Sequence, residues 1–401
     1  MENIDCAVVG GGPAGLMAAE RLAAAGRAVT VFDRMPSVGR KFLLAGRGGL
    51  NITHTEPLDR FAAHYGDAAA ALIPALQAFG PQDLRDWCAG LGEPTTVGSS
   101  GRVFPASFKA TPLLRAWLRR LAGLGVQFRV GHRWLGWDPA GALRFETAAG
   151  ASSVRAGATL LAMGGASWPR LGSDGAWADI LRADGVTVTP LQPSNVAVLR
   201  PWSDHFRERF AGSPLKRLVG TVDAHQAHGE AVITATGLEG GLIYALGRPI
   251  REALERDGVA RLTLDLRPDL DEATLHRRMG GPGVSRANAW RRAGLSAAAA
   301  GLLRETGAEP KRVMLDITGL APITRAISTA GGVALGAGMH LQGRPGVFVA
   351  GEMLDWDAPT GGYLMQACFS TGWQAGGVML DSLGSEHREP DPATRASPQP
   401  V

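Results

Sequence analysis

The apolar positions at the start of the chain form a strand–helix–strand pattern. Residues 4–9 (Ile-Asp-Cys-Ala-Val-Val) predict a short buried strand, because apolar residues dominate a run that is too short for a helix. Residues 16–25 are rich in alanine and predict an apolar helix that ends at Gly26. A second apolar run at residues 29–32 predicts another strand. This order of elements is typical of the βαβ unit of an α/β domain.

The pattern changes further along the chain. Residues 58–92 and 111–124 predict helices. After Pro193 the chain turns to short β-like runs separated by turns, at residues 195–200, 215–225, 229–235 and 261–266. Residues 270–307 then return to a helical pattern. A sheet-rich and then helical segment therefore interrupts the domain that the first residues begin.

These patterns predict a discontinuous first domain with an insertion. We expect an α/β, Rossmann-like domain built from residues 1–192 and 326–383. Residues 193–325 are expected to form an inserted substrate domain. That domain should be β-rich and barrel-like over residues 193–267 and helical over residues 268–312.

The composition indicates a folded protein with a large core. Hydrophobic residues make up 45% of the 401 positions and charged residues 19%, which excludes wholesale disorder. The 55 glycines follow no fixed period, which excludes collagen-like chains and repeat arrays. The formal net charge of +4 neither requires nor excludes a polyanionic partner. Residues 384–401 are rich in proline, serine and charge and predict a flexible tail.

The cysteines and the N-terminal residues predict a cytoplasmic protein. Cys6, Cys88 and Cys368 lie far apart and form neither a disulfide framework nor a C-x-x-C motif, which favours a reducing compartment. The first residues lack the basic start of a secretory signal. No uncharged apolar stretch reaches the roughly 18–20 residues that cross a bilayer. We therefore expect no membrane partner. His225 and His228 have no third ligand near them, so we also expect no metal site.

The turn between the first strand and the first helix predicts a dinucleotide site. It reads Gly10-Gly11-Gly12-Pro13-Ala14-Gly15. Gly10 permits a tight turn, Gly12 lets the backbone approach a pyrophosphate, and Gly15 lets helix and strand pack closely. The helix N-terminus then offers free N–H groups to phosphates. Asp33 ends the second strand, where it would accept hydrogen bonds from the two ribose hydroxyls of an adenosine.

Glycine turns of this kind also occur without a ligand, but several later segments favour an extended cofactor. Basic residues and glycines follow the second strand, a buried run at residues 159–163 ends on two glycines, and another at residues 346–350 ends on Gly-Glu. Residues 360–363 then open a helix. These segments supply as candidate cofactor contacts Arg34, Arg40, Lys41, Gly46, Gly48, Gly49, Asn51, Ala162, Gly164, Gly165, Gly351, Glu352, Gly361, Gly362 and Tyr363.

Up to about residue 380, the chain resembles the HI0933-like (BaiN/YhiN-like) flavoproteins, a branch of the two-dinucleotide-binding-domain flavoprotein superfamily. The motifs that carry the resemblance occur in the family order: Val8–Gly15, Gly39–Lys41, Gly46–Asn51, Gly101–Pro105, Ala162–Gly165, Gly172–Gly175, Gly331–Val333, Gly351–Asp355 and Thr360–Tyr363. The resemblance implies a tightly bound FAD, with its ribityl chain near Gly351 and Glu352. It also implies that the isoalloxazine ring lies between the loop Gly46–Asn51 and the helix start Thr360–Tyr363.

The chain departs from the family pattern beside the flavin. Relatives commonly carry a cysteine just before the asparagine of the glycine-rich loop, and this chain has Leu50 before Asn51. We therefore expect a subfamily whose substrate or half-reaction differs. A helix N-terminus at residues 360–363, pointed at the flavin, would stabilise the anionic reduced ring and favour hydride acceptance.

The resemblance and the motifs together predict an FAD-dependent oxidoreductase. The expected reaction is reduction of an electron-poor C=C bond of a small-molecule substrate, with NAD(P)H as a transient reductant, because a single G-x-G-x-x-G leaves no separate nicotinamide domain. Reduction also needs a proton donor. Tyr363, Arg47 and Arg102 are the candidates for proton donor or substrate anchor, from their positions beside the cofactor motifs.

Two alternatives remain open at this stage. Residues 273–304 carry six arginines and no acidic residue, which would suit phosphate contacts in an enzyme that reduces uracil to dihydrouridine in ribosomal or transfer RNA. The arginines are Arg277, Arg278, Arg286, Arg291, Arg292 and Arg304. A solvated basic face is the simpler explanation of these arginines. The other alternative is a flavin-binding sensor without turnover. The pattern does not predict an oligomeric state.

Overall fold

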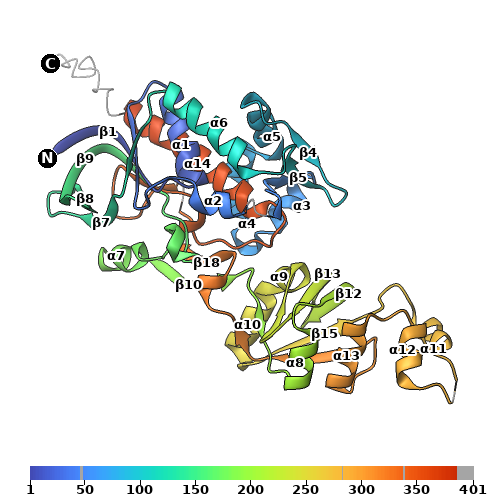
Figure 1. The fold of residues 1–401 in the computed structure, drawn as a ribbon. Coiled ribbons are helices and arrows are strands. Elements are labelled where there is room, and N and C mark those ends of the chain that lie inside the picture. Colours follow the sequence, from blue (N-terminus) through green and yellow to red (C-terminus); the bar gives the residue numbers. More distant parts are fainter. Residues whose placement is uncertain (46–47, 282, 337–338, 386–401) are drawn as a thin grey trace, which may run out of the picture. The chain divides into compact units, whose positions relative to one another are not determined.

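The computed structural model divides the chain into two compact units (Figure 1). It describes residues 1–45, 48–281, 283–336 and 339–385. The first unit combines Met1–Gly165, Pro169–Leu191 and the chain from Gly331 onward, and the second combines Ala166–Trp168 with Gln192–Ala330. The chain therefore leaves the first unit and returns to it, and each unit has its own hydrophobic core.

A seven-stranded sheet forms the centre of the first unit. Its strands are β1 (Glu2–Val9), β2 (Val29–Asp33), β6 (Gln127–Val130), β7 (Arg133–Trp137), β8 (Leu143–Thr147), β9 (Gly150–Leu161) and β19 (Val347–Val349). Strands β6, β2, β1, β9 and β19 pair in parallel, whereas β8 pairs antiparallel with both β9 and β7. The parallel part gives the Rossmann-like layer that the first residues predict.

The register of the parallel strands brings three chain segments to one edge of the sheet. Val9 lies opposite Phe32 on one side and opposite Leu161 on the other. The residues that follow, Gly10, Asp33 and Ala162, therefore leave the sheet at its carboxyl edge. Ligands of open α/β sheets bind at this edge.

Helices of the first unit pack around this sheet, and the longest of them is formed by residues near the C-terminus. They are α1 (Pro13–Ala24), α2 (Arg40–Ala45), α3 (Leu58–Ala63), α4 (Ala69–Ala78), α5 (Pro81–Gly90), α6 (Ala110–Gly123), α7 (Trp177–Ala183) and α14 (Tyr363–Ser385). Helices α1 and α14 lie side by side (Figure 1). A side chain at Gly372 of α14 would place its Cβ 2.2 Å from the carbonyl oxygen of Ala14, so only glycine permits this approach.

A buried carboxylate ties α5 and α6 to α1. Glu20 on α1 accepts hydrogen bonds from Trp117 Nε1 at 2.7 Å and Trp87 Nε1 at 3.1 Å. It also pairs with Arg120 at 3.0 Å. The charge of Glu20 is thus compensated inside the core, as a buried charge requires. A three-stranded sheet of β3 (Thr53–His54), β5 (Arg102–Pro105) and β4 (Thr95–Val97) lies on the same unit.

The second unit is sheet-rich, with helices around a seven-stranded sheet. The strands follow the order β16 (Val313–Ile317), β15 (Ala260–Asp265), β12 (Pro214–Val222), β13 (His225–Thr234), β14 (Gly237–Glu239), β11 (Val198–Leu199) and β17 (Gly319–Leu320). The helices around it are α8 (Asp204–Phe210), α9 (Gly241–Ala245), α10 (Gly247–Asp257), α11 (Glu272–Met279), α12 (Arg286–Arg292) and α13 (Ala297–Thr306). Among the described strands, β16 and β17 end the order without pairing with each other, so the barrel-like segment forms an open sheet.

The long segment of the second unit, residues 192–330, is entered and left through a pair of strands. β10 (Val188–Ser194) leads out of the first unit and β18 (Ser328–Val333) leads back, and the two pair in a two-stranded sheet. None of the helices in the described part of the chain combines the length and apolarity that crossing a membrane requires.

Candidate functional site

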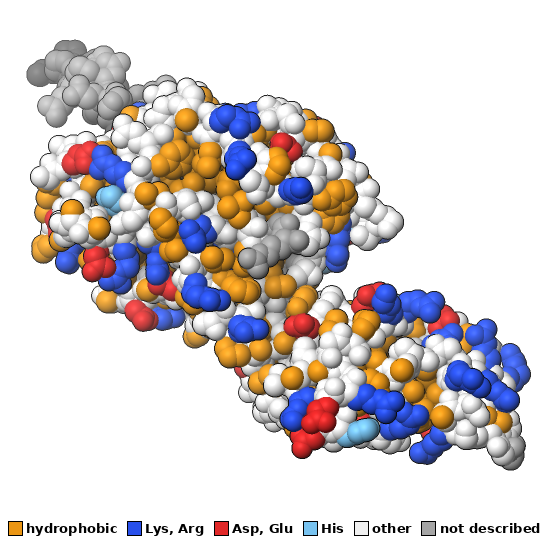
Figure 2. All heavy atoms as spheres, in the orientation of Figure 1, with side chains coloured by type: hydrophobic (Ala, Val, Ile, Leu, Met, Phe, Trp, Pro, Cys, Tyr) orange, Lys and Arg blue, Asp and Glu red, His pale blue; other side chains and the backbone are white. Residues whose placement is uncertain are grey.

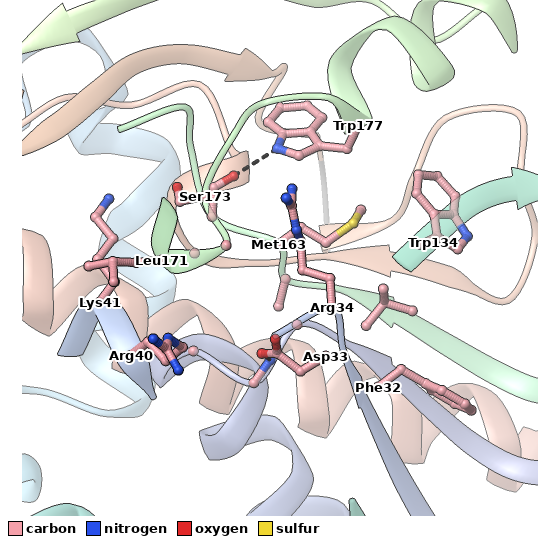
Figure 3. Close-up of a pocket in the computed structure, with 18 of the residues that line it drawn as sticks. Phe32, Asp33, Arg34, Arg40, Lys41, Trp134, Met163, Leu171, Ser173 and Trp177 are labelled. Carbon is pink, nitrogen blue, oxygen red and sulfur yellow. Dashed lines mark hydrogen bonds between the residues drawn. The ribbon is translucent and has the colours of Figure 1, made fainter. Parts of the chain in front are cut away.

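A pocket opens in the first unit at the carboxyl edge of the parallel sheet (Figure 3). Its wall is built by the first glycine turn, the end of β2, the start of α2, part of β7, the segments after β9 and the Gly351–Glu352 turn. Figure 3 shows Asp33 and Arg40 on one side of the pocket and Ser173 and Trp177 on the other. These segments are far apart in the sequence and meet because their strands are neighbours in the sheet.

The first glycine turn has the geometry of a phosphate cradle. A Cβ on Gly10, whose φ is +110°, would lie 2.3 Å from the Ala162 carbonyl oxygen, and one on Gly15 would lie 2.0 Å from the Gly10 carbonyl oxygen. Both glycines are therefore required by close backbone packing. A Cβ on Gly12 would meet no atom within 4 Å, so it would project into open space instead. Gly12 thus leaves room where a pyrophosphate approaches the N-terminus of α1.

Asp33 is held rigidly at the end of β2. Its Oδ2 accepts a hydrogen bond from the Gly11 backbone N–H at 2.9 Å, and its Oδ1 accepts one from the Met35 N–H at 2.8 Å. Burial raises the pKa of Asp33 above its ordinary value, and these two bonds oppose that shift. Each carboxylate oxygen can accept a second hydrogen bond, so ribose hydroxyls have acceptors here.

Charged side chains line other parts of the pocket wall. Lys41 Nζ lies 2.6 Å from Glu352 Oε2, which also accepts the Gly165 backbone N–H at 3.2 Å. Arg34 pairs with Asp174, which joins the loop after β2 to the segment before α7. Each of these two cations is compensated by a carboxylate, so they offer N–H donors to phosphates and little net positive charge.

Three buried polar atoms on the pocket wall have no hydrogen-bond partner among the described residues. They are Arg40 Nε, Trp134 Nε1 and Ser173 Oγ. Buried polar groups are normally satisfied, so such atoms point to a polar group that is absent from the chain itself. Together with the space beside Gly12, they fit a cofactor with phosphate and hydroxyl groups.

The strand that follows the second glycine-rich loop meets the start of α14. Asn51 Nδ2 donates hydrogen bonds to the carbonyl oxygens of Thr53 and Val103, at 2.8 and 3.0 Å. A Cβ on Gly362, whose φ is +101°, would lie 2.5 Å from the Thr53 carbonyl oxygen. β3, which follows the loop, is therefore in direct contact with the start of α14. Leu50 is fully buried in the core of the first unit, and its position holds no thiol.

A cluster of titratable groups surrounds Tyr363, the first residue of α14. The Tyr363 hydroxyl donates to Glu56 Oε1 at 2.5 Å, and His64 Nε2 lies 3.1 Å from the same oxygen. Arg102 lies on β5 opposite His54 of β3, and its charge lowers the pKa of Tyr363. Burial, with Glu56, outweighs this and raises the pKa of Tyr363. The hydroxyl therefore keeps its proton at neutral pH.

The structure places most of the predicted cofactor contacts on the pocket wall. Those that line it are Gly10, Gly12, Pro13, Ala14, Asp33, Arg34, Arg40, Lys41, Ala162, Gly164, Gly351 and Glu352. Others lie beside the pocket or near the start of α14: Gly15, Asn51, Gly165, Gly361, Gly362 and Tyr363. Gly48 and Gly49 belong to the loop between α2 and β3, where a Cβ on Gly49 would lie 3.6 Å from the Phe104 ring. Gly46 and Arg47 lie outside the described residues, as does nearly all of the predicted tail.

Several wall residues carry no motif that could have revealed them. Residues 132–135 reach the pocket because β7 belongs to an antiparallel extension of the sheet, which local sequence does not show. Cys368 lines the pocket from the second turn of α14, and burial raises its pKa to about 12. His54, Glu56 and His64 did leave a signal, because three titratable residues follow the glycine-rich loop closely.

The fold and the site define a dinucleotide-binding flavoprotein with a Rossmann-type domain and a sheet-rich second unit. A family model described as the HI0933-like protein Rossmann domain matches residues 4–378. The chain therefore belongs to the HI0933-like family of FAD-binding flavoproteins.

Two curated relatives show different activities within this similarity. A 3-dehydro-bile acid Δ(4,6)-reductase of Clostridium scindens is 26% identical over 276 residues, which are 67% of this chain and 66% of the relative. A ribosomal RNA dihydrouridine synthase of Haemophilus influenzae is 45% identical over 64 residues, which are 16% of this chain and 14% of the relative. The chain thus matches less than two thirds of the length of either relative.

Solved structures share the fold at low sequence identity. The open conformation of a flavocytochrome c3 fumarate reductase matches with a TM-score of 0.55 and 15% identity, over 95% of this chain and 79% of that one. The 3-ketosteroid Δ1-dehydrogenase of Sterolibacterium denitrificans matches with a TM-score of 0.53 and 13% identity, over 96% of this chain and 100% of that one. At these identities the likeness concerns the architecture alone.

Proposed function

We propose that the protein is an FAD-dependent oxidoreductase that reduces an electron-poor C=C bond of a small molecule, with NAD(P)H as the transient reductant. The observation that carries the proposal is the pocket, where the open cradle at Gly12, the fixed carboxylate of Asp33 and three unpartnered polar atoms meet. When bound, FAD supplies hydride transfer between reductant and substrate.

The residues of the pocket have distinct roles in this proposal. Gly12 and the N-terminus of α1 hold the pyrophosphate, and Asp33 accepts hydrogen bonds from the adenosine ribose. Arg40 and Ser173 supply polar atoms for the phosphates and the ribityl hydroxyls. Glu352, held by Lys41, would accept hydrogen bonds from the ribityl chain.

The relative from Clostridium scindens supports the choice of substrate class. That relative is named as a Δ(4,6)-reductase of 3-dehydro bile acids, whose C=C bonds are conjugated with a ketone, and this chain aligns with it over 67% of its own length. A conjugated ketone needs a hydride at one carbon and a proton at the other, so a proton donor must stand at the site. Tyr363, Arg102 and Arg47 are the candidates for proton donor or substrate anchor in the proposal.

Anaerobic mixing separates an oxidoreductase from a flavin-binding sensor. We expect NADH or NADPH to bleach the flavin absorbance of the purified holoprotein. We also expect addition of a 3-dehydro-Δ4,6 bile acid to restore the absorbance, with a reduced product detected by mass spectrometry. A flavin that neither nucleotide bleaches would support the sensor, and a bleached flavin that no conjugated ketone reoxidises would exclude the proposed substrate class.

A second candidate function rests on a basic surface of the second unit. We define this surface by six exposed arginines, Arg277, Arg278, Arg286, Arg291, Arg292 and Arg304. Figure 2 shows Lys and Arg side chains gathered at α11 and α12, and no ion pair is recorded for these six arginines among the described residues. Trp290 is buried beneath Arg304, so it offers no ring for stacking on a base. Phosphate contact is thus the chemistry that the surface supports.

Charge reversal tests whether the basic surface binds RNA. If it does, changing Arg277, Arg278, Arg291 and Arg292 to Glu should weaken binding of ribosomal RNA. The slope of the logarithm of the binding constant against the logarithm of the salt concentration should become less steep by roughly three. Reversing the exposed arginines of the first unit, Arg60, Arg115, Arg119 and Arg144, changes the net charge equally and serves as the control. Equal effects of the two sets, or none, would exclude this second function.

A further inference from the structure

Tyr363 is hydrogen-bonded to Glu56 at the start of α14, and His64 lies beside the same carboxylate oxygen. The Tyr363 hydroxyl and the His64 Nε2 both meet Glu56 Oε1, at 2.5 and 3.1 Å. A proton that reaches this oxygen from His64 therefore faces the Tyr363 oxygen without any rotation of the carboxyl group. The three side chains become more exposed in order, since the Tyr363 residue is 6% exposed and the side chains of Glu56 and His64 are 18% and 38% exposed. These three side chains thus lead from a buried hydroxyl to solvent.

His54 lies beside this cluster but is held in another role. Its Nε2 lies 2.8 Å from the Ser100 carbonyl oxygen, which can only accept, so Nε2 carries the proton. Its Nδ1 accepts the Glu56 backbone N–H at 3.2 Å and therefore carries none. Although Nδ1 lies 3.8 Å from the Glu56 carboxylate, it has no proton to give. His54 fixes the Glu56 backbone, and His64 is the imidazole that faces solvent.

Packing fixes the direction of the Tyr363 side chain. Its ring lies against Phe61 and His64, with centroid distances of 4.9 and 4.1 Å, and stacks with His54 at 5.8 Å. Its backbone carbonyl accepts the Tyr65 hydroxyl at 2.8 Å. The titratable and charged groups that face Tyr363 are thus Glu56, His54, His64, Tyr65 and Arg102.

The cluster lies close to the cofactor pocket along α14. Cys368, on the same helix, lines that pocket. At a rise of about 1.5 Å per residue, Tyr363 stands only about 7–8 Å from Cys368 along the helix axis. The start of α14 is therefore less than two helical turns from a residue of the pocket wall.

From this geometry we propose that Tyr363 donates the proton of the reduction and that Glu56 and His64 reload it from solvent. The inference rests on the proposed reductase function. The substrate π bond is lost as two C–H bonds form, one with hydride from the FAD that NAD(P)H has reduced and one with the Tyr363 proton. A protonated His64 then passes its proton to Glu56 Oε1, Glu56 passes it on to the Tyr363 phenolate, and His64 is protonated again from solvent. Glu56 and His64 act through Tyr363 and are positioning residues.

The first experiment needs no substrate. The chain has 3 tyrosines, so incorporation of 3-fluorotyrosine gives a fluorine NMR spectrum that Tyr363→Phe assigns. The ring fluorine lowers the phenol pKa and brings its titration towards a range in which the fold survives. We expect Glu56→Gln to move the Tyr363 titration to lower pH, because it removes the adjacent anion. Glu56→Asp should leave the titration closer to that of the unaltered chain. A titration that Glu56→Gln does not move would overturn the inference.

The second experiment follows turnover of the holoenzyme with NADPH and a 3-dehydro-Δ4,6 bile acid. Tyr363→Phe should slow product formation by about 100-fold or more, while bleaching of the flavin by NADPH persists. His64→Ala should slow it by roughly 10-fold, alter its pH profile and recover with added imidazole. The exposed His225, changed to Ala, is the matched control.

The possible failures are distinguishable. If the unaltered enzyme reduces the ketone and His64→Ala matches it in rate and pH profile, the relay is overturned and the reductase function stands. If the unaltered enzyme reduces no conjugated ketone, the proposed function fails, and the fluorine titration still decides whether Glu56 governs the Tyr363 proton.

Discussion

At the scale of single residues, the site depends on a few side chains whose positions are fixed by the backbone. Asp33 shows this most clearly, because backbone N–H groups of Gly11 and Met35 hold both of its carboxylate oxygens. The carboxylate is therefore oriented before any ligand arrives, so little ordering entropy remains to be lost on binding.

Replacing Asp33 by Asn tests its role in cofactor binding. We expect FAD affinity to fall by about 10- to 100-fold, since a hydrogen bond to a charged group is worth about 1.5–3 kcal/mol. Quenching of flavin fluorescence measures the affinity, and the exposed Asp59, changed to Asn, is the control. An unchanged affinity would remove Asp33 from the cofactor site.

The pH dependence of FAD affinity follows from the same residue. The ionised carboxylate accepts hydrogen bonds from ribose hydroxyls, and protonation removes that charge. Because burial raises the pKa of Asp33, affinity should begin to fall with decreasing pH earlier than an exposed aspartate would cause. In Asp33→Asn this part of the pH dependence should disappear.

Residues differ in how far the sequence alone reveals them. Asp33 and the glycines of the first turn were predictable, because their spacing within one βαβ unit is local. The partnership of Tyr363 with Glu56 was not predictable, because 307 positions separate the two residues. Only the packing of α14 against the loop after β3 brings them together.

At the scale of elements, α14 connects the two ends of the site. Its first residue carries the Tyr363 hydroxyl, and Cys368 in its second turn lines the pocket. The sequence predicts a helix that opens after residues 360–362, and the structure begins α14 at Tyr363. It could not reveal the contact of β7 with the pocket, because pairing in the sheet, and not local periodicity, places that strand.

Gly362→Ala tests the contact between the start of α14 and β3. The added Cβ would meet the Thr53 carbonyl oxygen at 2.5 Å, at a backbone φ of +101°. We expect a loss of about 2–4 kcal/mol in the free energy of unfolding, from backbone strain and overpacking together. Urea unfolding followed by circular dichroism measures this loss.

Gly384→Ala is the matched control on the same helix. A Cβ there would meet no atom within 4 Å, so we expect a change of less than about 1 kcal/mol, towards higher stability. Equal stabilities of the two variants would contradict the close contact at Thr53.

At the scale of the whole molecule, the cofactor pocket and the basic surface lie on units with separate hydrophobic cores. The cofactor pocket belongs entirely to the first unit, and the basic surface belongs to the second. The sequence prediction placed the return to the first domain at residue 326, whereas the structure divides the units after Ala330. The difference arises because β18 pairs with β10 across the crossing, and strand pairing is not visible in a local pattern.

The central claim is that the pocket of the first unit binds FAD, and the flavin content of the purified full chain tests it most directly. We expect a yellow protein that releases equimolar FAD on denaturation, identified by chromatography against FMN and riboflavin. We further expect Asp33→Asn to lose this flavin on dialysis more readily than the unaltered chain. A full-length, folded chain that is colourless and stays colourless after incubation with FAD would contradict the flavoprotein function altogether.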